Sequence, residues 1–192
     1  MPARPRSARD AAKIDLPLAQ VRRYLEPGPV VLLTSAWNGE RDVMTLGWHT
    51  VMEFTPALVG CVIARGNHSR TLIDASGACA INLPTRAMAD TVAAIGNCSG
   101  TEVDKFQAFR LQTEPAEKID APLLRDCHAQ FECRVHDRRL VDDYDFFVLE
   151  VLRARVAPRP HDPRTLHYQG DGRFMVAGDS IARRRFFTPD KL

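Results

Sequence analysis

The chain of 192 residues has few cysteines, and their arrangement marks neither a cross-linked nor a metal-binding protein. The five cysteines are odd in number and form no CxxC motif. Cys61, Cys79 and Cys133 stand inside apolar, strand-like segments, which predicts reduced and mostly buried thiols rather than a disulfide framework or a zinc site. Cys127 and His128 are adjacent, and because adjacent side chains usually point apart, a shared metal ion is disfavoured.

The chain also has no apolar run long enough to span a bilayer, and its basic N-terminus lacks the apolar core of a secretory signal. Charge is nearly balanced, with a formal net charge of +2, which gives little reason to expect nucleic acid as a partner. These absences predict a cytoplasmic protein that binds neither nucleic acid nor a membrane.

Familiar catalytic motifs are missing as well. The sequence has no GxSxG, no HExxH, no Walker loop and no GxGxxG. These absences argue against hydrolytic catalysis of the common kinds, and no side chain is singled out as catalytic. They also leave no Rossmann fingerprint for a nicotinamide cofactor.

What is present fits one soluble domain. An apolar fraction of 45% and a charged fraction of 26% are ordinary for a globular protein of this length. We expect a flexible basic tail over residues 1–13 and a single domain over residues 14–192. The tail is interpreted as solvated, with a polyanion-binding arm as the less favoured alternative.

Hydrophobic spacing places the first elements. Ile14, Leu18, Val21 and Leu25 recur at helical intervals and predict a short amphipathic helix. Residues 29–37 form an apolar, β-branched run, and the Asn38-Gly39 pair that follows is a strong hairpin signal. The pattern predicts a return strand over residues 43–52 and a buried third strand over residues 57–65.

Helices are predicted on either side of a fourth strand at residues 78–83. The first begins at Asn67 or Ser69 and ends at Gly77, and the second runs from Thr85 to Gly96. A long connection over residues 97–126 precedes strands at residues 129–137 and 146–157. The fold expected is mainly β with inserted helices, arranged as an antiparallel barrel rather than a doubly wound parallel sheet.

The segment RGNHSRT places polar side chains at the start of a helix, directly after a buried strand. Unpaired backbone N–H groups there, together with Arg65, Arg70 and nearby hydroxyls, supply what a phosphate group needs. The alternative is a plain capped helix with surface arginines, and the residues alone favour this alternative.

The segment RDVMTLGWHT mixes strand-like alternation with an unusual Gly-Trp pair. Thr45 offers a hydroxyl, Gly47 would let a flat ring approach the backbone, and Trp48 could stack on it. The alternative is an ordinary barrel strand with Trp48 in the core, which the residues alone also favour.

Taken in order, several segments resemble the flavin reductase-like family, the FMN-binding split barrels that include flavoredoxin. The resemblance covers about residues 20–156, and its specificity comes from the order and spacing of the parts. The segments that carry it are EPGPVVLLTS, MTLGWH, PALVGCVIARGNHSRTLI, CAINLPT, IGNCSGTEVDKF and APLLRDCHAQFECRV.

This resemblance implies a Greek-key split β-barrel that forms a homodimer, with FMN near the subunit interface. The residues expected to border the flavin ring are Thr45, Leu46, Gly47, Trp48 and His49. Those expected to hold the phosphate and ribityl chain are Arg65, Asn67, His68, Ser69 and Thr71. Asn82 is expected to approach the cofactor, and Lys105 and Phe106 to come from a loop that closes over it.

The implied activity is an FMN-dependent oxidoreductase, in which NADH or NADPH delivers hydride to flavin N5. Electrons then pass to an acceptor or to a partner oxygenase. The alternatives are a flavoredoxin-like electron carrier with little nicotinamide activity, and a barrel that has lost its flavin. The chain departs from the family at Asp42, often Asn, and at Gly47, often Ser. Asp42 is expected either to disfavour anionic reduced flavin or to point to solvent. His167 and Tyr168 are further candidates for reaching the cofactor.

Overall fold

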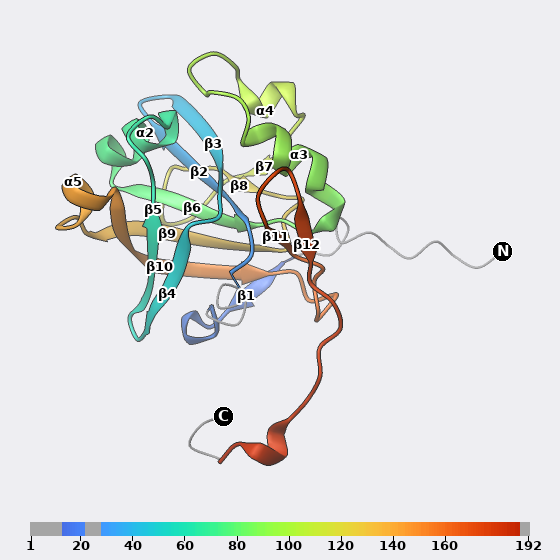
Figure 1. The fold of residues 1–192 in the computed structure, drawn as a ribbon. Coiled ribbons are helices and arrows are strands. Elements are labelled where there is room, and N and C mark those ends of the chain that lie inside the picture. Colours follow the sequence, from blue (N-terminus) through green and yellow to red (C-terminus); the bar gives the residue numbers. More distant parts are fainter. Residues whose placement is uncertain (1–12, 22–27, 189–192) are drawn as a thin grey trace.

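In a computed structural model of the chain, residues 13–21 and 28–188 are described (Figure 1). Within them, one eight-stranded sheet dominates the molecule. Strand β2 (Val31–Trp37) returns through Asn38 and Gly39 into β3 (Glu40–Leu46), and both turn residues have positive φ, 50° and 83°. Such a turn matches the right-handed twist of paired strands, so the hairpin predicted from the Asn-Gly pair is confirmed.

The path across the sheet is β3-β2-β6-β9-β10-β5-β4, and neighbouring strands are antiparallel. The remaining members of this path are β4 (His49–Phe54), β5 (Ala57–Val62), β6 (Ala78–Leu83), β9 (Ala129–Asp137) and β10 (Phe146–Val156). The eighth strand, β1 (Ile14–Leu16), pairs with β10 outside this path.

Closure of the sheet follows from a two-residue connection. β3 and β4 stand at opposite ends of the strand order, yet only Gly47 and Trp48 separate them in the chain. Because two residues span at most about 7 Å, the two ends of the sheet must meet there. The sheet therefore curls into a barrel whose seam lies at Gly47 and Trp48, and the expected mainly β split barrel is confirmed.

Two apolar clusters hold the barrel together. The larger cluster fills the barrel and includes Leu33, Ile81, Phe131, Phe147 and Leu149, all fully buried. The smaller cluster lies under the helix that follows β6, and contains Val43, Val92, Ile95, Phe106 and Leu166, among others. Burial of each such side chain contributes about 1.5–3 kcal/mol, so this second cluster fixes the helix against β3.

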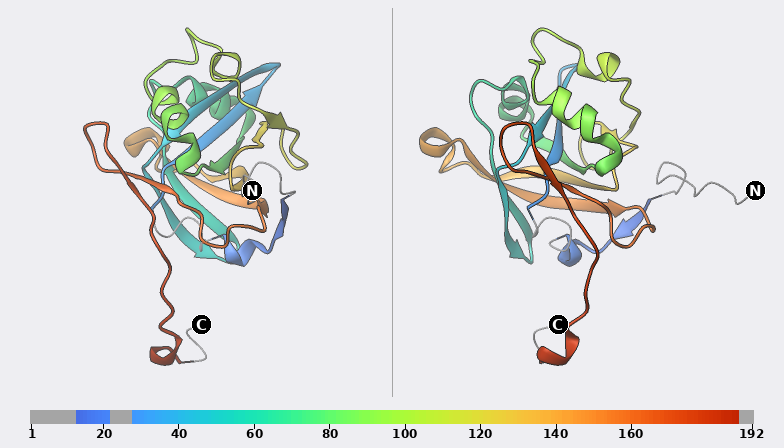
Figure 2. Two further views of the ribbon diagram at one scale, coloured as in Figure 1. Left: turned by 90° about the vertical axis from the view of Figure 1, so that its right-hand side faces the viewer. Right: turned by 45° about the vertical axis from the view of Figure 1, so that its right-hand side comes forward.

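The helices and short elements lie mostly beside β3 or at the barrel ends (Figures 1 and 2). α2 (His68–Ser76) ends at Gly77, whose φ is 70°, and α3 (Ala89–Ile95) follows the turn η3 (Arg86–Met88). The long connection contains α4 (Lys105–Ala108), β7 (Thr113–Glu114) and β8 (Leu123–Leu124). The other elements are η2 (Leu18–Gln20), α5 (Val141–Tyr144), β11 (Leu166–Tyr168), β12 (Phe174–Val176) and η4 (Arg184–Phe186).

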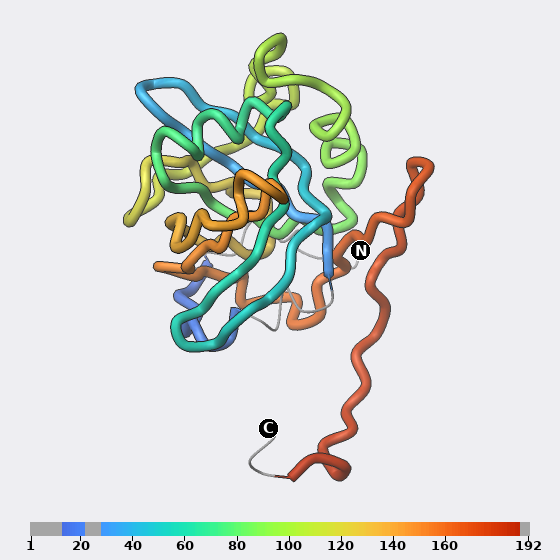
Figure 3. Tube along the Cα trace, turned by 60° about the vertical axis from the view of Figure 1, so that its left-hand side comes forward, coloured from blue at the N-terminus to red at the C-terminus, as the bar shows by residue number. Residues whose placement is uncertain are grey.

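The C-terminal part forms a hairpin and then leaves the barrel. β11 and β12 pair with each other and stand beside α3, while the segment after β12 runs away from the body (Figures 2 and 3). Val30 N donates to Leu166 O at 2.7 Å, and Leu166 is only 1% exposed. The hairpin is therefore anchored to the start of β2 and to the second apolar cluster.

Two local predictions were wrong. The segment from Ile14 is not a helix at its start, because Ile14–Leu16 pairs with β10 as a strand. Leu25, the last residue of that expected helix, lies outside the described residues, as does most of the expected tail, residues 1–12. The return strand expected over residues 43–52 is two strands, because the chain must cross the seam at Gly47.

The cysteines match the expectation of free, mostly buried thiols. Cys61, Cys79 and Cys133 are fully buried in the barrel, and burial raises the pKa of the Cys79 thiol to about 12. Such thiols stay protonated and unreactive at neutral pH. No helix among the described residues is long and apolar enough to cross a membrane.

Candidate functional site

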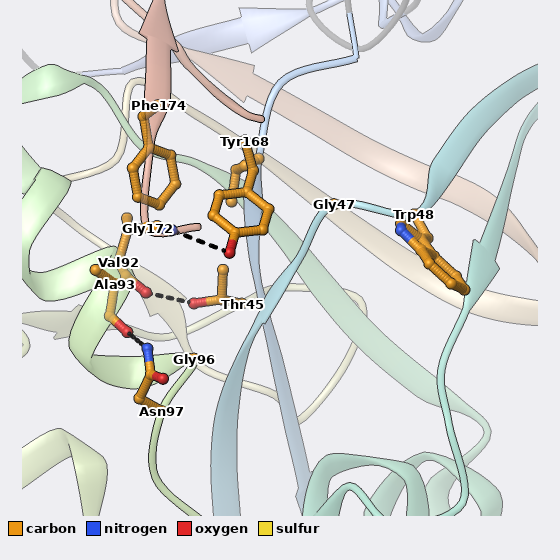
Figure 4. Close-up of a pocket in the computed structure, with 11 residues that line it drawn as sticks. Thr45, Gly47, Trp48, Val92, Ala93, Gly96, Asn97, Tyr168, Gly172 and Phe174 are labelled. Carbon is orange, nitrogen blue, oxygen red and sulfur yellow. Dashed lines mark hydrogen bonds between the residues drawn. The ribbon is translucent and has the colours of Figure 1, made fainter. Parts of the chain in front are cut away.

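A pocket of about 350 Å³ opens at the barrel seam, between the end of β3, α3 and the β11–β12 hairpin (Figure 4). Pockets that bind small molecules generally begin at about 300 Å³. The residues that line it are Val30, Thr45, Gly47, Trp48, Val92, Ala93, Gly96, Asn97, Tyr168, Gly172 and Phe174. The seam thus combines an interrupted strand, a helix and three aromatic residues around one cavity.

Thr45 fixes one wall of this pocket. Its Oγ1 donates a hydrogen bond of 2.7 Å to Val92 O, which ties β3 to α3. Gly96, at the end of α3, allows this close packing, since a Cβ there would stand 3.3 Å from Thr45 Cβ. Figure 4 shows the Thr45 hydroxyl turned toward α3, so it is already engaged within the chain.

Gly47 and Trp48 form the open side of the pocket. No other described atom lies within 4 Å of the place where a Cβ on Gly47 would stand. The backbone at Gly47 therefore borders free space, and a flat group can approach it closely. Trp48 is 76% exposed, so the alternative in which it packs in the core is wrong.

Tyr168 and Phe174 form the aromatic wall that the hairpin contributes. Their ring centroids are 5.2 Å apart and the planes are tilted by 50°. The tight turn between them needs positive φ at Gly170, Asp171 and Gly172, and Gly172 N donates weakly to the Tyr168 hydroxyl at 3.4 Å. Of the two further candidates from the sequence, Tyr168 lines the pocket, whereas His167 contacts Thr165 Oγ1 at 3.0 Å instead.

Two predicted ring neighbours face elsewhere. Leu46 is 4% exposed and belongs to the barrel core, because its side chain alternates with that of Thr45. His49 Nε2 lies 2.6 Å from Pro29 O, which makes Nε2 the protonated ring nitrogen. Burial lowers the pKa of His49, so the ring is neutral at pH 7.

The other end of β3 holds a buried polar cluster, which we call the Asp42 cluster: Asp42, Ser69 and Lys105. Asp42 is 2% exposed, which contradicts the alternative in which it points to solvent. Ser69 Oγ donates to Asp42 Oδ2 at 2.7 Å, and Lys105 Nζ lies 3.3 Å from Asp42 Oδ1. Lys105 Nζ also donates to Val43 O at 2.7 Å and so caps the exposed edge of β3.

The remaining residues predicted for the phosphate and its chain surround the start of α2. Asn67 is the N-cap of α2, but its Nδ2 donates backward to Ala64 O, at 3.2 Å. Arg65 Nη2 donates to Asp142 O at 2.6 Å, and His68 Nε2 lies 3.5 Å from Glu40 Oε1. Thr71 is exposed on the first turn of α2. These residues are brought together, but most already have partners within the chain.

Asn82 and Phe106 are structural in this arrangement. The Asn82 amide is fully buried; it donates to Leu32 O and Thr34 Oγ1, and its Oδ1 accepts from Leu124 N at 2.8 Å. Phe106 is 4% exposed in the second apolar cluster, with the Arg41 guanidinium 4.3 Å above its ring. Both therefore position β2, β3 and the long loop rather than line the pocket.

Sequence reasoning missed most of the pocket wall on α3 and the hairpin. None of the wall residues on or directly after α3 carries a chemical signature of its own: Val92, Ala93, Gly96 and Asn97. The one available signal was the pair of aromatic residues at Tyr168 and Phe174, separated by two glycines typical of a tight turn.

The barrel seam and its pocket define a class, the split barrel that presents a cavity beside an interrupted strand. The chain matches the family described as flavin reductase like domain over residues 22–175. It belongs to that family, and the resemblance found in the sequence is confirmed.

Three proteins illustrate what the chain is similar to. It is 29% identical to the uncharacterized protein YddH of Escherichia coli K12, over 88% of this chain and 96% of that protein. It superimposes with a TM-score of 0.85 on an FMN-binding domain of a flavin reductases-like enzyme from Shewanella baltica, at 26% identity, over 91% of this chain and 98% of the other. The flavoredoxin of Desulfovibrio vulgaris matches in fold, with a TM-score of 0.73, 19% identity and coverage of 81% and 90%.

Proposed function

We propose that this protein binds the isoalloxazine ring of FMN in the seam pocket and acts as an NAD(P)H-dependent flavin oxidoreductase. The observation that carries the proposal is the open backbone at Gly47, which faces the aromatic pair Tyr168 and Phe174 across a cavity of about 350 Å³. A flat, partly apolar ring suits a cavity lined by glycine and aromatic residues better than a flexible polar substrate does.

The residues present suit such a ring. Gly47 would approach one side of the ring, Tyr168 and Phe174 would cover another and exclude water, and Trp48 would stand at the mouth. Backbone groups at the break between β3 and β4 are the natural hydrogen-bonding partners for the polar edge of the ring. The bound flavin would supply the redox chemistry, accepting hydride at N5 from NADH or NADPH and passing electrons to an acceptor or partner oxygenase.

The protein's share of this work is binding and orientation. Thr45 is held by Val92 and His49 by Pro29, so neither is poised to move a proton during turnover. This agrees with a sequence that offers no catalytic acid, base or nucleophile, because hydride transfer needs none. The nicotinamide would dock on the open side, next to Trp48.

Absorption spectroscopy tests the proposal. Purified protein mixed with FMN and separated from excess flavin should retain a flavin spectrum, or show saturable binding by titration. Anaerobic addition of NADH or NADPH should then bleach the visible flavin band. If the protein does not bind FMN at all, the proposal is wrong, and a barrel that has lost its flavin is the remaining interpretation.

A flavin-bound electron carrier is the second candidate. Its support is the exposed mouth of the pocket, where Trp48 is 76% exposed and a protein acceptor has direct access. Binding of FMN without bleaching by either nicotinamide, but with reduction by a reduced protein donor, would favour the carrier over the reductase.

We also propose that two copies of the chain associate through the edge strand β4. Met52 and Phe54, here called the β4 patch, are 47% and 49% exposed. An edge strand that presents two large apolar side chains is a surface that proteins usually cover. Light scattering should give the mass of a dimer, and Met52→Glu should shift it toward the monomer; a monomeric wild-type protein would contradict this proposal.

A further inference from the structure

Ser69, which the resemblance assigns to the flavin phosphate, belongs to the buried Asp42 cluster. Ser69 is fully buried and Lys105 is 4% exposed, and both contact the carboxylate of Asp42. A buried charge is strongly held by the groups that compensate it, because removal of one leaves the other unpaired in a medium of low polarity. Ser69 and Lys105 are therefore committed to Asp42 rather than available to a ligand.

The long loop seals this cluster. A Cβ on Gly100 would overlap the Asp42 carboxylate, so the loop backbone lies directly against it. The same loop also supplies Lys105, the first residue of α4, directly after the N-cap residue Asp104. No larger group fits between the loop and Asp42 unless the loop moves.

The charged side chains around α2 are also paired with the chain's own acids. Arg65 Nε lies 3.4 Å from Asp145 Oδ1, and Arg70 lies 2.6 Å from Asp74 Oδ2 and 2.9 Å from Asp145 Oδ1. Arg70 is 6% exposed, so its pairing is protected from solvent, whereas that of Arg65 is open to it. The start of α2 thus presents little uncompensated positive charge through these two arginines.

We propose that Asp42 makes the flavin site nearly indifferent to the 5′-phosphate, so that the protein takes riboflavin as well as FMN. This inference rests on the proposed function, since it concerns the ligand of the same pocket. A phosphate at Ser69 would have to take the hydroxyl away from Asp42, which already accepts a charge-assisted hydrogen bond from it. The ring end of the site has no such competitor, so the ring supplies most of the affinity.

The Asp42–Lys105 pair is neutral as a unit, and this gives a sharp test. Asp42→Asn keeps an oxygen acceptor for Ser69 but releases the positive charge of Lys105. A released charge at that place favours a phosphate dianion and leaves riboflavin unaffected. The double variant Asp42→Asn/Lys105→Gln removes both charges and restores neutrality.

The experiment is a titration of FMN and of riboflavin with each variant, followed by flavin fluorescence at low and at high salt. For the wild-type protein we expect the two dissociation constants to agree within about threefold. Asp42→Asn should tighten FMN relative to riboflavin by about tenfold at low salt, with the gain lost at high salt. The double variant should return to the wild-type ratio, and Asp143→Asn, an exposed carboxylate on α5, should leave it unchanged.

A wild-type preference for FMN of more than about a hundredfold would overturn the inference, because only a direct phosphate contact explains it. An unchanged ratio in Asp42→Asn, with the variant shown to be folded by circular dichroism, would overturn it too. If Asp42→Asn does not fold, the wild-type ratio and the double variant decide. If neither flavin binds the wild-type protein, the proposed function itself fails. A strong preference for FMN, in contrast, leaves the proposed function standing and contradicts only the inference.

Discussion

The two ends of β3 differ in a way that bears on function. At Gly47 the strand stops, the backbone borders free space, and aromatic side chains stand around a cavity. At Asp42 the same strand is covered by α2 and the long loop, and a carboxylate, a hydroxyl and an ammonium satisfy one another with almost no exposure. One end borders an open cavity, and the other is already filled by the protein.

Under the proposed function, this difference indicates which part of a flavin the protein would recognise. A ligand can occupy the cavity at Gly47 without breaking interactions within the protein. A ligand at Asp42 would first have to break hydrogen bonds and an ion pair. Stability should therefore depend on the Asp42 end, and flavin affinity on the Gly47 end. Four substitutions or titrations can break or sharpen that separation.

The largest effect is expected from Lys105→Met. This change leaves the buried Asp42 carboxylate with Ser69 as its remaining side-chain partner among the described residues, and a buried charge without its counterion costs about 3–5 kcal/mol of unfolding free energy. Urea denaturation measures it. The double variant Asp42→Asn/Lys105→Met should recover much of the loss, and a single variant no less stable than the double would show that the pair does not matter.

Tyr168→Ala should act on affinity instead. Tyr168 lines the pocket and is 56% exposed, so its removal should weaken FMN binding by about tenfold while unfolding changes little. Tyr144→Ala is the matched control, because Tyr144 is 68% exposed on α5 and lines no part of the pocket. Equal effects of the two substitutions on FMN fluorescence titrations would contradict the assignment.

Thr45→Val should have a smaller effect than the two preceding substitutions. It removes the 2.7 Å hydrogen bond to Val92 O and leaves that carbonyl without its side-chain partner, at a cost of about 1 kcal/mol in stability. Because the hydroxyl is turned toward α3, flavin affinity should stay within about threefold of wild type. A large loss of affinity with unchanged stability would mean that Thr45 contacts the flavin directly.

The smallest effect is expected from the protonation of His49, near the open end of β3. Burial lowers the pKa of His49 below its ordinary value of about 6.5, so the folded state binds this proton less readily than the unfolded state. The contribution of neutral His49 to the free energy of unfolding is therefore present above the pKa of His49 in the unfolded state, and it is lost as the pH falls below that value. NMR titration should show His49 neutral at pH 6.5 with the proton on Nε2; a pKa above 6.5 would contradict this.

Elements with a local signal were predictable from the sequence. Asn38-Gly39 specified the β2–β3 hairpin, and Gly77 and Gly96 marked the ends of α2 and α3. The seam was not predictable, because Met44, Leu46 and Trp48 continue the alternation of an unbroken strand. Only the position of β3 and β4 at opposite ends of the sheet requires a break at Gly47.

The candidate site was predictable only at the seam, where Thr45, Gly47 and Trp48 line the pocket, and the contacts of the other predicted residues were not. Ser69 was assigned to the phosphate and Lys105 to a loop that closes over the cofactor, yet their burial against Asp42 depends on segments far apart in the chain. Sequence patterns report which face of an element is apolar, and they do not report which polar group meets which. Likewise, the hairpin carrying Tyr168 and Phe174 reaches the pocket only through the anchoring of Leu166 to Val30.

The central claim is that the flavin ring binds at the open end of β3. Competition between FMN and lumiflavin, which is the ring without its ribityl phosphate chain, tests it most directly. The account predicts that lumiflavin displaces FMN completely, and that Tyr168→Ala weakens both ligands by the same factor. Failure of lumiflavin to displace bound FMN would show that the phosphate end governs binding, and would contradict the account.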